Sequence, residues 1–110
     1  MKIISIKIGE KTYMSGKITA YLTKEAMKLQ RDALELGKNA KKLTEDADET
    51  AAQDMFIDLV ELMDRKVWLI CESYGKQFTP DDLERELTSE EIDIEVNKII
   101  SAASGVIEKN

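Results

Sequence analysis

One cysteine and several pairs of acids are the side chains in this sequence that could do chemistry. A cysteine nucleophile needs a nearby base, and the 110 residues include no histidine that could activate Cys71. Asp81 and Asp82, like Glu90 and Glu91, directly follow residues typical of a helix start, where solvated acids are common. Acid–base catalysis by paired carboxylates needs one of them desolvated. We therefore predict no catalytic residue and no enzymatic activity.

The sequence also argues against the common metal and cofactor sites. Asp46, Asp48 and Thr50 resemble the start of a calcium-binding loop. Ala51 stands where that loop needs glycine, and Ile57 stands where it needs a bidentate glutamate. The five glycines are dispersed and form no phosphate-binding loop. We expect no metal, no cofactor and no small-molecule substrate.

Charge and hydropathy narrow the classes of partner. The apolar run at 67–71 is far shorter than a membrane span, and Lys7 interrupts the apolar start of the chain, where a signal peptide would lie. A single cysteine forms no intrachain disulfide, so nothing points to an oxidising compartment. The net charge of −6 weighs against nucleic acid, which clustered basic residues bind. We expect a cytoplasmic protein that binds neither membranes nor nucleic acid.

The two halves of the chain carry opposite charge. Residues 1–44 contain ten basic and four acidic side chains, whereas residues 45–110 contain six basic and eighteen acidic ones. Halves of opposite sign can pack within one molecule, or they can pair between molecules and steer self-association. With apolar stripes on more than two helices, this division predicts a homo-oligomer in which the basic first helix of one copy meets an acidic surface of another.

The expected elements must position these surfaces within one small domain. The length suits a single hydrophobic core, so we predict one domain at 1–110, with a β-hairpin region at 1–21 and a helical bundle at 22–110. The fold class is mainly α (α+β): an N-terminal β-hairpin packed on a bundle of three long helices plus one short helix.

The hairpin is expected from strand periodicity and a turn signal. Ile4, Ile6 and Ile8 alternate with polar residues, as in a half-buried strand. Gly9 and Glu10 follow, and glycine suits the first central position of a type II′ turn because its backbone adopts positive φ easily.

Three threonines carry helix-start signals. Thr23 is an expected N-cap, with Leu22 and Met27 as a hydrophobic staple. Thr79 precedes a proline and two aspartates, and Thr88 has a glutamate three residues on, as in a capping box. The expected helices span about 23–43, 50–74, 80–87 and 88–107.

Each long helix carries an apolar face that we expect to be buried. The first has a narrow, near-heptad stripe, typical of a helix that packs along another helix. Trp68 is expected to be largely buried, because the second helix is apolar on almost every side there. The faces consist of Ala26, Leu29, Ala33, Leu36, Ala40 and Leu43 on the first helix; Met55, Phe56, Leu59, Met63, Val67 and Ile70 on the second; and Ile92, Val96, Ile99, Ala103 and Val106 on the last.

Three segments together resemble a known family. A hairpin with a Lys-x-Tyr return strand (6–13) precedes a long helix rich in lysine and glutamate (23–30). Residues 74–83 contain the most distinctive motif, Gln-Phe-Thr-Pro-Asp-Asp-Leu, and a closing helix follows. This order resembles the tail assembly chaperones of long-tailed phages and prophages of Gram-positive bacteria, over nearly the whole chain.

The resemblance implies a non-enzymatic role. Such proteins bind the tape measure protein, keep its helical segments soluble, help recruit tail tube subunits (the major tail protein) and are absent from the finished virion. A small cytosolic helical adaptor or regulatory domain with one partner is the alternative function. Because a narrow apolar stripe can bind partner helices, the candidate protein-interaction residues are Leu29, Ala33, Leu36 and Ala40; the alternative is that they pack on the chain's own second helix.

The resemblance also bears on the end of the chain. Genes of this family often yield a second, longer product by ribosomal slippage, and this length matches the shorter product. Glu108, Lys109 and Asn110 can be encoded by a string that contains an A-AAA-AAC slippery heptamer, although a frayed polar end explains these residues equally well. A longer product that shares residues up to about Asn110 is therefore expected.

Overall fold

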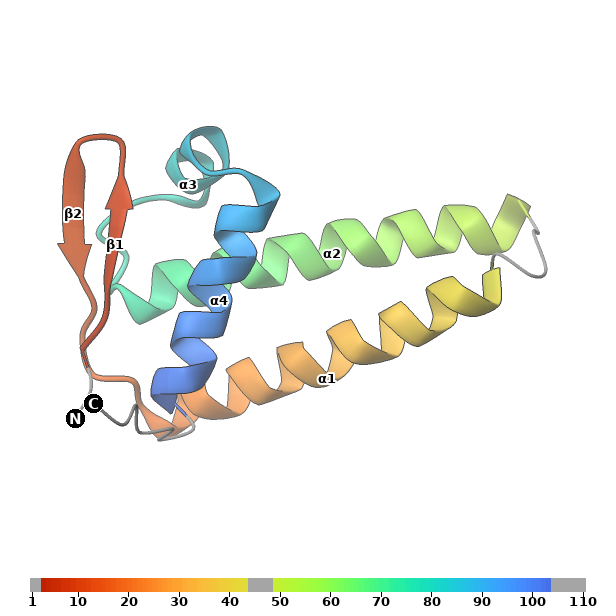
Figure 1. Ribbon diagram of the computed structural model, residues 1–110, viewed down its shortest axis with the longest axis horizontal. Coiled ribbons are helices and arrows are strands. Elements are labelled where there is room, and N and C mark those ends of the chain that lie inside the picture. The colour runs from red at the N-terminus through yellow and green to blue at the C-terminus, as the bar shows by residue number, and fades with distance from the viewer. Residues whose placement is uncertain (1–2, 44–48, 104–110) are drawn as a thin grey trace.

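The computed structural model describes residues 3–43 and 49–103 and confirms a mainly helical fold with an N-terminal hairpin (Figure 1). The predictions for Leu43 as a side chain, for Val106 and for the last three residues lie outside what is described. The elements are β1 (Ser5–Ile8), β2 (Lys11–Met14), α1 (Ala20–Leu43), α2 (Glu49–Ser73), α3 (Pro80–Glu86) and α4 (Ser89–Ala103).

The hairpin forms where the periodicity predicts it. β1 and β2 are antiparallel, with Ile8 opposite Lys11, and Gly9 takes a φ of 62° in the turn between them. Beyond the strands, the Ile4 amide donates to Ser15 Oγ at 3.0 Å and the Ser15 amide donates to the Ile4 carbonyl at 2.8 Å. One face of β1, including Ile8, is therefore buried in the core.

The helices form two layers. α1 and α2 pair along their length, and α4 crosses both of them near the end that carries the hairpin (Figure 1). The Lys98 ammonium donates to the Ser5 carbonyl at 2.6 Å and so ties α4 to β1. The buried core joins all of these elements and includes Ala26 and Leu29 of α1, Val67, Leu69 and Ile70 of α2, Leu83 of α3, and Ile92, Val96 and Ile99 of α4.

Two of the three predicted helix starts are confirmed as capping boxes. The Asp82 amide donates to Thr79 Oγ1 at 3.1 Å, while the Thr79 amide donates to the Asp82 carboxylate at 3.1 Å. Thr88 and Glu91 make the same reciprocal pair at 3.1 and 2.9 Å. Because the C-cap of α3 is Leu87 and α4 is capped by the next residue, the two helices join without a linker.

The third predicted start is wrong. α1 begins at Ala20, so Thr23 lies inside the helix, where its hydroxyl donates to the Thr19 carbonyl at 3.0 Å. Thr19 is the residue that caps α1, because its Oγ1 accepts from the Leu22 amide at 3.3 Å. Met27 is exposed, so the expected staple with Leu22 is absent as well.

The predicted burial of α2 is only half right. Val67 and Ile70 are in the core, but Phe56 and Leu59 are exposed, because the 15 residues of α4 cross only the end of α2 nearer the hairpin (Figure 1). Trp68 is 37% exposed rather than largely buried. It lies at the surface, where its ring meets the ring of Tyr21 edge to face with centroids 6.3 Å apart.

Candidate partner-binding surfaces

The α1–α2 pair extends past α4 as an arm, formed by residues 32–43 of α1 and 49–65 of α2 (Figure 1). Lys66 marks its base, because its ammonium is 2.7 Å from the carboxylate of Asp93 on α4. Towards the hairpin from this ion pair, α2 lies in the core; away from it, α1 is the principal neighbour of α2. Surfaces on the arm are therefore supported by one neighbouring helix rather than by the whole core.

The apolar stripe of α2 leaves the core where the arm begins. Val67 is 1% exposed and Met63 is half-buried, whereas Val60 is 62% and Phe56 is 68% exposed. Spacings of three and four residues keep these side chains on one side of the helix. Ile57 and Leu59 of α2 and Leu34 of α1 are also exposed on the arm. We call the exposed apolar residues of α2 on the arm the apolar arm face: Phe56, Ile57, Leu59 and Val60.

An apolar face of this kind can bind a partner helix. Monomeric proteins seldom leave contiguous apolar surface uncovered unless it serves binding, and an amphipathic helix recognises such a surface through residues at helical spacing. The wide apolar run of α2, which the sequence predicts to be buried, therefore lacks a cover within the described part of its own chain.

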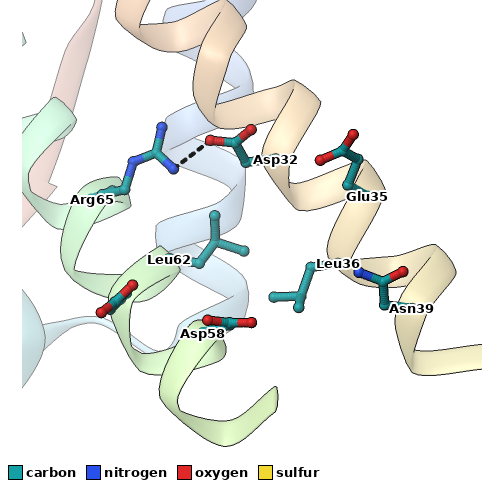
Figure 2. A pocket seen from close by; sticks show the side chains of 8 residues that line it. Asp32, Glu35, Leu36, Asn39, Asp58, Leu62 and Arg65 are labelled. Atoms are coloured by element: carbon teal, nitrogen blue, oxygen red, sulfur yellow. Dashed lines mark hydrogen bonds and ion pairs between the residues drawn. The ribbon is translucent and has the colours of Figure 1, made fainter. Parts of the chain in front are cut away.

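A groove runs between the two helices of the arm (Figure 2). It has a volume of about 210 Å³, and the side chains of Leu36 and Leu62 point towards each other across it (Figure 2). A second hollow of about 200 Å³, lined by Tyr21, Trp68 and Leu69 among others, adjoins it and shares Arg65. We call the first hollow the acidic groove; it is lined by Asp32, Glu35, Leu36, Asn39, Asp58, Glu61, Leu62 and Arg65.

One ion pair closes the base of the acidic groove. Arg65 Nη1 lies 2.7 Å from Asp32 Oδ2 (Figure 2). Outside the groove, Arg31 Nε lies 3.0 Å from Asp32 Oδ1. Hydrogen bonds from Arg65 and then Arg31 hold the pKa of the Asp32 carboxyl below its usual value. The groove thus keeps a fixed negative charge, with a single cation at one end.

The four predicted interaction residues are divided between the core and the arm. Leu29 is buried in the core, and Ala33 is half-buried against it. Leu36 is half-buried in the acidic groove, and Ala40 is half-buried further along the arm. Their role in binding a partner stays a prediction.

Sequence reasoning does not identify the apolar arm face or the acidic lining of the groove. Phe56 and Val60 have the same apolar character as Val67, so their composition alone does not distinguish an exposed stripe from a buried one. One signal was available in the expected lengths, because a last helix shorter than the second cannot cover all of it. Asp58 and Glu61 give no local signal, since their position depends on how α1 and α2 pair.

Metal-ligand clusters, membrane-spanning helices and the single thiol complete the survey of the described residues. No group of three or more potential metal ligands occurs among them, and no helix within the described ranges is long and apolar enough to cross a membrane. Cys71 is buried, and desolvation together with the nearby acids, Glu72 first, raises the pKa of its thiol to about 11.

We expect this thiol to be unreactive in the folded protein. At pH 8 the thiolate that attacks a disulfide reagent is scarce when the pKa is about 11, and burial also blocks access. Reaction with a chromogenic disulfide should be at least about 100-fold slower in the native protein than in guanidinium chloride. Equal rates in the two conditions would show that Cys71 is accessible.

Comparison with protein families identifies a match over the whole chain. A family model described as phage tail chaperone protein matches residues 1–110. No curated protein and no solved structure matches the chain.

Proposed function

The chain belongs to the phage tail chaperone family, and from this membership we propose that it is a non-enzymatic tail assembly chaperone. In this proposal it binds the tape measure protein and helps recruit subunits of the tail tube. The proposal places it in the cytoplasm of the bacterial host, in a long-tailed phage or prophage of Gram-positive bacteria, and outside the finished virion.

The apolar arm face is the observation that carries this proposal. A chaperone for a long helical protein must offer apolar surface to segments that would otherwise aggregate, and Phe56 and Val60 offer such surface at helical spacing. A partner helix laid along the arm would continue the layer that α4 begins over the α1–α2 pair. Leu36 and Ala40 would line the adjoining seam, with Leu29 and Ala33 supporting it from the core side.

Co-expression with the tape measure protein of the same phage tests the proposal. The tagged wild-type chain should raise the amount of soluble tape measure protein and co-purify with it. Val60→Asp places a charge in the centre of the apolar arm face and should reduce co-purification at least about tenfold, because one desolvated charge offsets the gain from burying the face.

Ile94→Asp is the matched control, because Ile94 is also exposed but lies on α4 rather than on the arm. It should leave co-purification unchanged. A wild-type chain that neither solubilises nor binds the tape measure protein would contradict the function, and equal loss in both variants would contradict the assignment to the arm.

Self-association is part of the same proposal. The charge division of the chain supports it. The ion pair between α1 and α2 joins Arg65, a cation of the acidic half, to Asp32, an anion of the basic half, so it uses none of the excess charge of either half. Basic side chains of α1 therefore remain available to acidic surfaces of other copies.

A further inference from the structure

The outer surface of α1 carries a ridge of positive charge. Lys24, Lys28 and Arg31 surround Met27, and with the start of the helix they line a shallow hollow. Met27 is exposed, so the ridge has an apolar centre with cations around it. Lys28 and Arg31 form only local pairs, with Glu25 at 3.3 Å and with Asp32 at 3.0 Å. We call these four residues the basic ridge.

The acidic groove has the opposite character. Within the described ranges, Glu35, Asp58 and Glu61 form no ion pair, although they surround the same hollow. Leu36 and Leu62 supply its apolar centre (Figure 2). Carboxylates held on both sides of a narrow groove repel one another, and a cation placed between them relieves that repulsion.

We infer that the basic ridge of one copy docks in the acidic groove of another copy. Three cations meet three unpaired carboxylates, and Met27 meets the leucines. The dimensions also match, because the ridge from Lys24 to Arg31 and the α2 side of the groove from Asp58 to Arg65 each cover eight residues, a rise of about 10 Å of helix. The inference rests on the self-association proposed above and names the surfaces that perform it.

The two surfaces touch within one molecule where Arg31 pairs with Asp32, a residue that lines the groove. Lys24 and Arg31 lie on α1, and α1 also forms one wall of the groove through Glu35 and Asn39. A continuous helix cannot fold onto its own side, so beyond this local pair the ridge can enter a groove only in another copy. The contact is heterologous: each copy offers its ridge to one neighbour and its groove to another.

Two charge-reversal variants test the contact by size-exclusion chromatography with light scattering. Lys24→Glu with Arg31→Glu reverses the ridge, and Asp58→Lys with Glu61→Lys reverses the groove. Each double variant alone should associate at least about tenfold more weakly than the wild type, because like charges then face each other. Glu84→Lys with Glu86→Lys on α3 makes the same change in net charge as the groove variant, but elsewhere, and should associate like the wild type.

Mixing the two variants gives the sharper result. The ridge variant keeps an intact groove and the groove variant keeps an intact ridge, and the two reversed surfaces also match each other, so an equimolar mixture should regain the association that each variant alone has lost. A chain that carries all four reversals should associate again, since its reversed ridge matches its reversed groove. Circular dichroism of each variant confirms that these exposed substitutions leave the helices intact.

The outcomes separate the two proposals. A wild-type chain that is monomeric at every concentration and salt concentration overturns the self-association itself. Wild-type assembly that persists in both double variants overturns this interface but leaves self-association standing. Assembly that is lost in Val60→Asp and kept in both charge reversals places the contact on the apolar arm face instead. Loss in each variant with no recovery on mixing also rejects a heterologous contact.

Discussion

Val67→Asp should strongly lower the free energy of unfolding of the protein, whereas Val60→Asp should leave it nearly unchanged. The two valines occupy the same side of α2, but Val67 is 1% and Val60 is 62% exposed. A carboxylate at position 67 would be buried without a partner, which costs about 3–5 kcal/mol, a large part of the 5–15 kcal/mol that stabilises a typical domain. At position 60 the carboxylate stays in water, and the change should be within about 0.5 kcal/mol.

Urea denaturation followed by circular dichroism measures both free energies of unfolding. The matched pair isolates burial, because the residue type, the helix and the substitution are the same. Equal destabilisation of the two variants would mean that the arm is covered within the monomer, and it would remove the apolar arm face as a binding surface.

Leu83→Ala should lower the free energy of unfolding by about 2–5 kcal/mol, the range for emptying a fully buried leucine site. Leu83 is 0% exposed and is the buried residue of α3, which has seven residues and is too short to form a stable helix alone. Its capping box fixes where α3 starts, but packing of Leu83 on the core holds α3 against α2.

Ile94→Ala serves as the control, because it removes a comparable apolar side chain from an exposed position of α4. Thermal unfolding of the two variants should differ by well over 5 °C for a domain of this size. A small effect of Leu83→Ala would show that α3 contributes little to the cooperative unit.

Signals that act over three or four residues are the part of the fold that the sequence predicts well. The N-caps at Thr79 and Thr88 form as expected, because each depends only on residues within one turn of the helix start. The start of α1 is misplaced because Thr19 is an equally suitable cap four residues before Thr23, and no local pattern ranks one above the other.

What covers an apolar face depends on tertiary structure, and there the sequence predicts less. Phe56 and Ile70 belong to one predicted face, yet only Ile70 is buried, since the point where α4 crosses α2 is not encoded in the periodicity of either helix. The same limit applies to the candidate site: the stripe on α1 predicts Leu36 as a lining residue, whereas its neighbours Asp58 and Glu61 become visible only when the two helices are paired.

The one-sided support of the arm has a consequence for how the chain opens. Amide protons in the core parts of α2 should exchange with solvent only when the whole domain unfolds. Those near Phe56 should need only the arm to separate, because Phe56 lies outside the buried core. The chain therefore contains a stable unit around α4 and a weaker one beyond it. Such a division would let the outer helices adjust to the proposed partner while the rest of the domain stays intact.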